Sequence, residues 1–477
     1  MHIHTDTRST PHARPKKRGF FALIAAIIGI NLLTLSSQAL QGQWGVHDPS
    51  RIIKYNGVYH VWGTGDQIYH MTSTDMVNWW TASTVFASGT YPSWITTYTG
   101  TGFTGFFWAP DCIYANGKYF LYYACSTWGS KKSAIGVATS TDLASWTDQG
   151  MVTYSTDTSD FNAIDPCPVL DASGNLWLSY GSFNSGIKLL QCSTSTGKPL
   201  NSTRYSLASP GGTAWSDGEN SCLIRNGSYY YLFYNRGGCC SGTNSTYYII
   251  MGRATSITGP YYDKNGKTLT TAGSGTTVLS TSGRYIGPGS LGLFSENGNN
   301  FVTFHFYDGW NNGVPLLGIA RLTFSSSWPV ISQDWIANGT YQVTNTSSGR
   351  CWDSWGCTGN SGSPVALGNY WAGSCQKWTF TSVGNGYYKI TSAQGGLALD
   401  SVGCGSGNGT LLDIYAYWGG GCQQWKAERM SDGTFEFSSA NGNNVIDIPG
   451  GNSADGTQLD LYDSNGLWTQ KWTVAAP

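Results

Sequence analysis

Residues 48–60 read DPSRIIKYNGVYH, and this stretch sets the pattern that decides the fold of the larger part of the chain. It combines a Pro-marked start, a short apolar strand, a tight Gly turn and a strand rich in aromatic side chains. The pattern occurs five times, with its turn glycines at Gly57, Gly117, Gly174, Gly227 and Gly298. Each unit can hold a four-stranded sheet, and five such sheets can close radially without a long open edge. We therefore predict an all-β chain with a five-bladed β-propeller at residues 44–332, with a flat β-sandwich as the alternative.

A second period, of 47 residues, governs the end of the chain beyond Gly339. It relates three aspartates and the tryptophans of three Gln-x-Trp motifs: Asp353, Asp400 and Asp447, and Trp378, Trp425 and Trp472. Three copies are too few for a propeller, so we predict a three-fold barrel, a β-trefoil, at residues 338–477. Cys357 and Cys375 recur as Cys404 and Cys422, which predicts one loop-closing disulfide in each of the first two repeats.

The first 39 residues have the pattern of a secretory signal peptide. Lys16-Lys17-Arg18 precedes an apolar run from Phe20 to Leu35, and Ser37-Gln38-Ala39 offers a small-x-small cleavage site. A retained signal anchor is the alternative, although the run is shorter than the ~20 residues of a membrane span. We expect a secreted protein that has no membrane contact after cleavage. All 12 cysteines lie on the exported side of this leader, so we expect most of them to be paired.

Composition indicates the kind of partner. The chain has 26 basic and 27 acidic residues, only 11% of it is charged, and no basic cluster occurs beyond the leader. This argues against nucleic acid as a ligand. Aromatic residues reach 14%, and Trp and Tyr combine a flat apolar face with a hydrogen-bonding edge, which suits sugars. The composition therefore indicates a sugar ligand. Separately, we expect the chain to be a monomer.

Three acids stand at matched places in the propeller repeats. Asp48 and Asp165 lie nine residues before their turn glycine, and Glu219 lies eight before its own. The first strand of each blade lines the central channel, so these carboxyl groups should meet at one mouth of it. Clustered carboxyls cannot all ionise cheaply, and their pKa values separate into those of an acid and a base. The alternative is structural, because Asp-Pro is a common turn starter.

Six short motifs resemble glycoside hydrolase family 43, and within it the α-1,5-L-arabinanases. They are His47-Asp48-Pro49-Ser50, Trp108-Ala109-Pro110-Asp111, Ile164-Asp165-Pro166, Gly218-Glu219-Asn220, Cys239-Cys240 and Phe304-His305-Phe306-Tyr307-Asp308. The resemblance implies an inverting enzyme that cleaves α-1,5-L-arabinofuranosidic linkages in arabinan. It implies that Asp48 is the general base, Glu219 the general acid, and Asp165 the residue that orients the acid and raises its pKa.

The same resemblance extends to substrate and metal contacts. We expect His47, Trp108 and Ser182 to contact the substrate, and His305 to hold a calcium ion whose other ligands are mostly water. Ser290 departs from the family, where many arabinanases have a histidine. The alternatives are an exo-acting arabinofuranosidase, a β-xylosidase or a galactanase on the same fold, or a secreted lectin without catalysis.

The Gln-x-Trp repeats resemble the ricin-type β-trefoil lectins, which place an Asp and an aromatic side chain around one sugar. Carried over, repeat two offers Asp400 with Tyr415, and repeat three offers Asp447 with Tyr462. Repeat one offers Asp353, but Gly368 stands where the aromatic residue should be, so Tyr370 or Trp371 would have to replace it. This resemblance implies that the trefoil anchors the enzyme to polysaccharide.

Overall fold

The computed structural model describes residues 41–477 apart from 77, 210–217, 283–284, 310, 333–335, 337, 385, 431–433 and 443. The predicted signal peptide, residues 1–39, lies outside the described residues. Within the described part of the chain, no helix is both long and apolar enough to cross a membrane.

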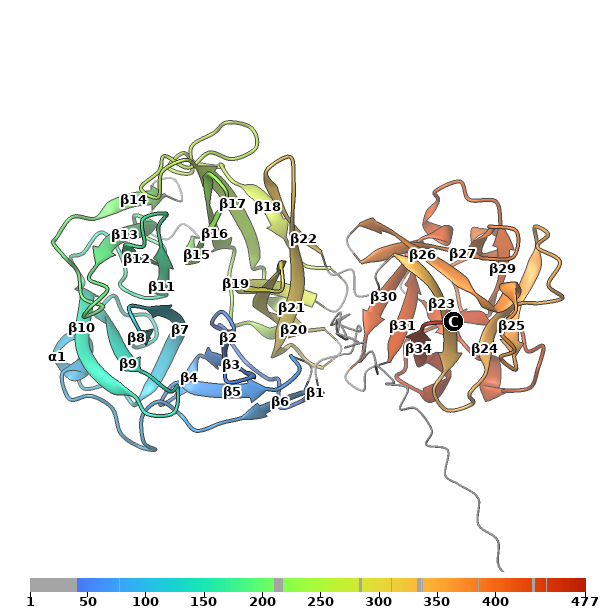
Figure 1. Cartoon of the computed structure of the whole chain (residues 1–477), viewed down its shortest axis with the longest axis horizontal. Helices are drawn as coiled ribbons and strands as arrows, with labels where there is room; N and C mark the ends of the chain where they lie inside the picture. Colours follow the sequence, from blue (N-terminus) through green and yellow to red (C-terminus); the bar gives the residue numbers. More distant parts are fainter. Residues whose placement is uncertain are drawn as a thin grey trace, which may run out of the picture. The chain divides into compact units, whose positions relative to one another are not determined.

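Five separate sheets form the first part of the chain, as predicted, and Figure 1 shows them in blue to yellow around a common centre. The first sheet runs in the order β1 (Gln41–Gly42), β6 (Asn78–Thr81), β5 (Tyr69–Ser73), β3 (Val58–Gly63) and β2 (Ile53–Tyr55). The second runs β10 (Thr147–Ser155), β9 (Ser133–Ser140), β8 (Lys118–Cys125), β7 (Phe106–Ala115) and β4 (Gly65–Asp66). The helix α1 (Ile95–Thr99) lies between these two blades in sequence.

The other three sheets have four strands each and follow the chain in order. The third holds β11 (Cys167–Leu170), β12 (Leu176–Tyr180), β13 (Ile187–Cys192) and β14 (Tyr205–Ala208). The fourth holds β15 (Glu219–Asn226), β16 (Tyr229–Arg236), β17 (Tyr248–Ala254) and β18 (Thr276–Leu279), with the short η1 (Gly242–Asn244) before β17. The fifth holds β19 (Tyr285–Glu296), β20 (Asn299–Asp308), β21 (Val314–Ser325) and β22 (Trp328–Ser332).

The propeller closes where its first and last blades meet. The segment before β2 bonds to β21, because the Val46 amide donates to the Pro315 carbonyl at 3.1 Å and the Leu317 amide to the Trp44 carbonyl at 2.9 Å. Apolar side chains of neighbouring blades, such as Val46 of the first and Leu317 of the fifth, then share one buried cluster. Packing between blades therefore holds the five first strands around one centre.

Twelve further strands, β23 to β34, form one network that closes on itself, which confirms the β-trefoil. They are β23 (Gly339–Asn345), β24 (Cys351–Ser354), β25 (Ser363–Gly368), β26 (Trp378–Gly384), β27 (Tyr387–Ser392), β28 (Ala398–Ser401), β29 (Thr410–Tyr415), β30 (Trp425–Arg429), β31 (Phe435–Ser439), β32 (Val445–Asp447), β33 (Asp460–Tyr462) and β34 (Trp472–Ala475). Short 3-10 turns separate some of them: η2 (Ser374–Gln376), η3 (Val402–Cys404), η4 (Gly421–Gln423), η5 (Pro449–Gly451) and η6 (Trp468–Gln470).

The tryptophans of the Gln-x-Trp motifs belong to the trefoil core. Trp378, Trp425 and Trp472 have no exposed surface. Each indole N–H donates to a carbonyl 26 residues earlier in the chain, in the same register in all three repeats. These side chains therefore cannot stack on sugars, which leaves that task to the loop residues.

The cysteines pair less than the sequence suggested. Disulfides join Cys357 to Cys375 and Cys404 to Cys422, as predicted, and a third joins the neighbours Cys239 and Cys240. The expectation that most of the 12 are paired is wrong, because six remain free: Cys112, Cys125, Cys167, Cys192, Cys222 and Cys351. All six are buried, mostly inside strands, where a cysteine packs as a small apolar side chain.

Candidate active site

Each blade has one non-glycine residue in the left-handed backbone region, either in its first strand or in the few residues before that strand. These residues are Asp48, Ala109, Asp165, Asn220 and Ser290, with φ between 36° and 58°. A side chain in this region is uncommon outside glycine, and such residues cluster at functional sites. In the second, fourth and fifth blades the residue coincides with a break in strand register. These bulges re-aim the side chains at the start of the strands.

Asp48 and Asp165 occupy equivalent places in this ring, whereas Glu219 stands one residue ahead of it. The third acid therefore reaches the same site from a neighbouring position, and its equivalent in the first blade is His47. Asn220, which follows Glu219, connects the two aspartates: its side-chain amide donates to Asp48 Oδ1 at 3.1 Å, and its backbone N–H donates to Asp165 Oδ2 at 3.2 Å. The structure thus brings the three predicted acids together.

Asp48 sits among hydrogen-bond donors. Its Oδ2 accepts from His47 Nδ1 at 2.7 Å and from the Thr64 hydroxyl at 2.8 Å. Burial works to raise the pKa of this carboxyl, but the charge and hydrogen bond of His47, the charge of His305 and the Thr64 hydrogen bond lower it to about 2. Asp48 is consequently a carboxylate at any pH near neutrality.

Glu219 and Asp165 are shifted the other way. Burial raises the pKa of Glu219, and the charge of Asp48 adds to this, although hydrogen bonds from Ser182 and Tyr247 oppose it. Burial, followed by the charges of Glu219 and Asp48, raises the pKa of Asp165 well above its usual range. One carboxylate therefore faces two carboxyls that hold protons more strongly, which is the pattern of an acid and base pair.

Ser182 and Tyr247 hold the side chain of Glu219. The Ser182 hydroxyl donates to Oε2 at 2.6 Å, and the Tyr247 hydroxyl donates to Oε1. Ser182 is 1% exposed, and its hydroxyl is bonded to the acid. The contact of Ser182 with substrate stays a prediction. Tyr247 and Asn220 were missed as site residues, and Asn220 could have been found from its place next to Glu219.

His47 and His305 form a stacked pair beside Asp48, with ring centroids 4.1 Å apart. The His47 Nδ1 faces a carboxylate and must carry a proton, so in the neutral ring Nε2 accepts a hydrogen bond from the Tyr307 hydroxyl at 2.7 Å. Burial lowers the pKa of His47, but the charge and hydrogen bond of Asp48 and the charge of Glu219 outweigh it, and the net shift is upward. Tyr307 is a further site residue that sequence reasoning missed.

The other ring, His305, is fully buried and is the residue predicted to hold calcium. Its Nδ1 accepts from the Asp48 amide at 3.1 Å, and burial, with the charge of His47, lowers its pKa to about 3. Its Nε2 is buried and has no hydrogen-bond partner within the described part of the chain. This orphaned nitrogen fits one metal ligand if the ring proton lies on Nδ1, where Asp48 Oδ1 is 3.5 Å away. Cation binding and the hydrogen bond from the Asp48 amide therefore exclude each other.

Trp108 lies half-buried near the start of β7, and its ring meets that of Trp128 edge to face at 6.3 Å. Trp128 is 80% exposed. The exposed Trp128 leaves aromatic surface open to solvent beside Trp108. The stacking of a sugar on Trp108 stays a prediction.

The trefoil places its predicted sugar ligands in a repeated arrangement. Asp400 and Asp447 are buried, whereas Tyr415 and Tyr462, on the paired strands β29 and β33, are 49% and 43% exposed. A buried carboxylate beside an exposed ring matches what a sugar needs, with hydroxyls on the acid and the C–H face on the ring.

Repeat one lacks this arrangement. Asp353 is present and buried, but a Cβ on Gly368 would stand 2.9 Å from Asp353 Oδ2. The exposed Trp371 is no special substitute, because Trp418 repeats it in the complete second repeat and both are 63% exposed. The sequence analysis missed a second difference. Asp413 and Asp460 pair across the strands with Asp400 and Asp447, whereas Asp353 pairs with Ala366.

The propeller and its acid cluster define a class of protein: a propeller glycoside hydrolase. The chain belongs to glycosyl hydrolases family 43, whose profile matches residues 42–329. The profile of the ricin-type β-trefoil lectin domain matches residues 326–415 and 374–462.

Named relatives agree with this assignment. The chain is 40% identical to the extracellular endo-α-(1→5)-L-arabinanase 1 of Bacillus subtilis, over 64% of this chain and 95% of the relative. It is 33% identical to an extracellular exo-α-(1→5)-L-arabinofuranosidase of Cellvibrio japonicus, over 61% of this chain and 87% of the relative. Among solved structures, the family 43 endo-arabinanase of Bacillus licheniformis matches with a TM-score of 0.57 and 41% identity, over 61% of this chain and 99% of that one.

Proposed function

We propose that this glycoside hydrolase cleaves α-1,5-L-arabinofuranosidic linkages in arabinan with inversion of the anomeric centre. The observation that carries the proposal is the opposite shift of the pKa values of Asp48 and Glu219 inside one funnel. The relatives supply the substrate class, since they are named as an endo-α-(1→5)-L-arabinanase and an exo-α-(1→5)-L-arabinofuranosidase.

The proposed mechanism uses the low pKa of Asp48 and the raised pKa of Glu219. Glu219 keeps its proton and donates it to the glycosidic oxygen as the bond breaks. Asp48, ionised, removes a proton from a water molecule that attacks the anomeric carbon from the opposite side. Asp165 accepts from the backbone amide of Asn220, whose side chain bonds Asp48, and ionisation of Asp165 would add a negative charge that favours the protonated form of Glu219. His47, Thr64 and Asn220 keep the Asp48 carboxylate in a fixed orientation.

A calcium ion in the channel stays part of this proposal, with His305 as the protein residue that would hold it and water as its other ligands. When bound, it would supply positive charge near the acid cluster and favour the ionised forms of the carboxyls. Without the ion, His305 contributes a buried, neutral ring whose Nδ1 accepts from the Asp48 amide, and this hydrogen bond would be lost when the ring proton moves to Nδ1 for cation binding.

Two further parts of the proposal concern location and anchoring. The relatives carry the word extracellular in their names, which supports secretion of this chain by its leader-like residues 1–39. The trefoil would hold polysaccharide through Asp400 with Tyr415 and Asp447 with Tyr462, and so keep the propeller near its substrate.

The acids are tested by replacing them one at a time. Glu219→Gln and Asp48→Asn should each lower kcat on linear arabinan by about 10²- to 10⁴-fold, since each removes one partner of general acid–base catalysis. Binding of arabinan by the trefoil should be unchanged in both variants, which controls for folding. Near wild-type turnover in either variant would refute the assignment of roles.

The length of the products separates endo from exo cleavage, because the named relatives include enzymes of both kinds. Early products from linear arabinan should be oligosaccharides of mixed length if the funnel is open at both ends. A single short product from the first minutes would assign exo action instead. Xylan and galactan serve as control substrates, because hydrolysis of either would favour a β-xylosidase or a galactanase instead.

A further inference from the structure

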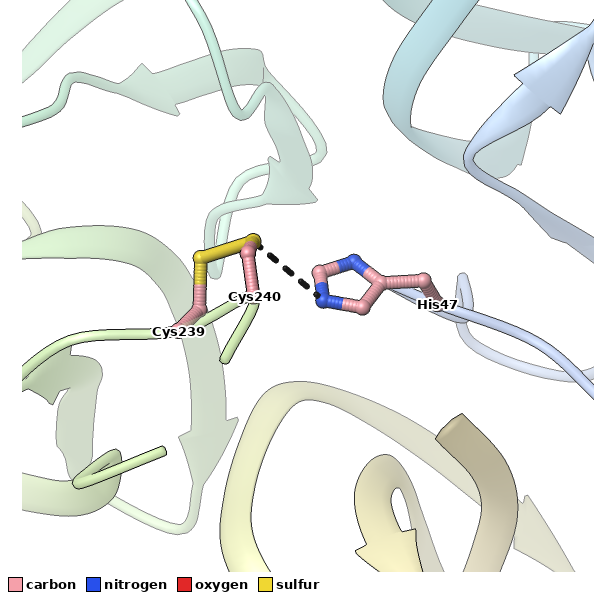
Figure 2. A group of neighbouring side chains, drawn as sticks. All are labelled: His47, Cys239 and Cys240. Carbon is pink, nitrogen blue, oxygen red and sulfur yellow. Dashed lines mark hydrogen bonds between the residues drawn. A yellow bond between two sulfur atoms is a disulfide. The ribbon is translucent and has the colours of Figure 1, made fainter. Parts of the chain in front are cut away.

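The vicinal disulfide Cys239–Cys240 lies against the site, and the mechanism above does not use it. It belongs to the loop between β16 and β17, where Cys239 is half-buried and Cys240 is exposed. Figure 2 shows the His47 ring directed at this disulfide, and the distance from His47 Nε2 to Cys240 Sγ is 3.8 Å. The disulfide is therefore open to solvent on one side and adjacent to the partner of the base on the other.

A chain of hydrogen bonds connects this loop to the base. The Cys240 amide donates to the Tyr307 hydroxyl at 2.7 Å, and that hydroxyl donates to His47 Nε2 at 2.7 Å. His47 Nδ1 in turn donates to Asp48 Oδ2 at 2.7 Å. Whatever binds His47 Nε2 in place of Tyr307 will therefore change the environment of Asp48.

The hydrogen bond from His47 to Asp48 gives this histidine the tautomer that a metal ligand needs. Its Nδ1–H is bound to a carboxylate, so Nε2 is the acceptor nitrogen of the neutral ring; it now accepts from the Tyr307 hydroxyl and lies 3.8 Å from Cys240 Sγ. Histidines that bind zinc commonly have this arrangement, because the carboxylate fixes the tautomer and makes the free nitrogen more basic. One ligand atom each from His47, Cys239 and Cys240 lies within 4.8 Å of the other two.

The distances suit zinc once the disulfide is open. Tetrahedral zinc with Zn–S of about 2.3 Å and Zn–N of about 2.0–2.1 Å separates a sulfur from a nitrogen by about 3.6 Å and two sulfurs by about 3.8 Å. The Cys240 Sγ to His47 Nε2 distance is already 3.8 Å. The two sulfurs must separate, and reduction allows this because it breaks the bond between them, while Cys239 Sγ already lies within 4.8 Å of the His47 ligand atom.

We propose that reduction of Cys239–Cys240 creates a site for a thiophilic divalent cation such as zinc, with the two thiolates and His47 Nε2 as its protein ligands. A dithiol reductant supplies two electrons, the S–S bond breaks, two thiols form, and the dithiol becomes a cyclic disulfide. Binding of the cation then releases the two thiol protons. The oxidised pair has no thiolate to offer, so the oxidised enzyme does not bind the metal.

The bound cation inhibits hydrolysis. It displaces the Tyr307 hydroxyl from His47 Nε2 and draws electron density from the ring, so the Nδ1–H bond to Asp48 strengthens. A base held by a stronger donor accepts a proton less readily. The disulfide thus keeps the exported enzyme active in metal-containing surroundings, and loss of the disulfide makes it sensitive to zinc.

The test compares the oxidised and reduced full-length chain with cobalt and zinc as probes. The chain is reduced with a phosphine, freed of reductant without oxygen, and titrated with Co²⁺, whose thiolate complexes absorb in the near ultraviolet. The reduced chain should bind one more Co²⁺ than a reduced Cys239→Ser/Cys240→Ser chain, which keeps every other cysteine. The oxidised chain should lack this band.

Zinc should inhibit the reduced enzyme at micromolar concentration, and a chelator should restore its activity. Cys404→Ser/Cys422→Ser, which removes a trefoil disulfide, should leave both the band and the inhibition in place. Cys239→Ser alone should weaken Co²⁺ binding by more than about tenfold, since even outer partners of metal ligands contribute about 10- to 100-fold to affinity. Equal Co²⁺ uptake by the reduced wild-type chain and the double serine variant would overturn the proposal, and so would equal zinc inhibition of the oxidised enzyme.

Discussion

Asn220 links two of the three acids of the site through hydrogen bonds that it donates. Its side chain donates to Asp48 and its backbone N–H to Asp165, so one residue sets the spacing of two acids that repel each other. It can do so because its backbone adopts φ 52°, a region that asparagine tolerates better than most residues. A hydrogen-bond donor between two carboxyls also stabilises charge on either of them.

Tyr247→Phe should shift the pH dependence of the enzyme in a defined direction. The Tyr247 hydroxyl stabilises the ionised form of Glu219 and so lowers the pKa of this acid. Its loss raises that pKa, and the acid keeps its proton to higher pH. The alkaline limb of kcat/KM should therefore move to higher pH, while the rate at neutral pH changes less than about tenfold. Ser182→Ala should move the limb the same way, and a shift to lower pH in either variant would contradict the assigned acid.

The residues of the site were partly predictable. Asp48, Asp165 and Glu219 carry a motif and a spacing to their turn glycines, and His47 and His305 stand in the same motifs. Tyr307 stands in the same motif as His305, but its role becomes visible only when closure of the propeller brings the fifth blade to His47. Thr64 and Tyr247 are single polar residues beside strands of the first and fourth blades, and only the fold brings their hydroxyls to Asp48 and Glu219.

At the level of elements, the trefoil repeats differ in the number of acids they carry. Asp413 lies opposite Asp400, and Asp460 opposite Asp447, and burial followed by the neighbouring charge raises the pKa of Asp413 and of Asp460 to about 6. Repeat one has Ala366 instead. The 47-residue spacing of 366, 413 and 460 could have shown this difference, but only strand pairing shows that the two acids face each other.

These acid pairs predict how stability depends on pH. An acid whose pKa is about 6 in the folded chain and about 3.9 when unfolded binds more protons when folded, so its contribution to stability increases as pH falls from about 6 to about 4. Asp413→Asn/Asp460→Asn should remove that part of the pH dependence. The melting temperature at pH 4.5 minus that at pH 7 should be lower in the variant than in the wild type. An unchanged difference would mean that these two carboxyls do not have raised pKa values in the folded chain.

The ring of left-handed residues is the feature of the strands that sequence reasoning could not supply. Turn glycines fix the far end of each first strand, and they predicted the blades well. The near end depends on bulges, which insert one residue and displace everything before it. In the fourth blade the break in register lies between Glu219 and Cys222, next to the acid.

For the whole molecule, two periods in the sequence predicted two folds, and the strands of each period form their own hydrogen-bonded sheets. A chain truncated before Asn338 should therefore still contain a folded propeller with all three acids. Hydrolysis of short soluble arabinan oligosaccharides should stay within about twofold, because the funnel is complete. Attack on insoluble arabinan should fall by about tenfold or more, because the local concentration provided by the trefoil is lost.

Asp400→Ala/Asp447→Ala in the full-length chain should reproduce the effect of truncation on insoluble arabinan. Asp353→Ala is the matched control and should have little effect, since its repeat lacks both the exposed aromatic ring and the second acid. If the truncated enzyme binds and degrades insoluble arabinan as well as the full-length chain, the trefoil does not anchor this substrate.

The central claim is that Asp48 and Glu219 act from opposite sides of the sugar as base and acid. Proton NMR of the first products from linear arabinan, recorded before mutarotation, tests it most directly. Inversion of an α-linkage predicts that the β-anomer of the new reducing end appears first and that its signal is absent with Glu219→Gln. An initial α-anomer would show retention and would contradict the assignment of Asp48 as a base that activates water.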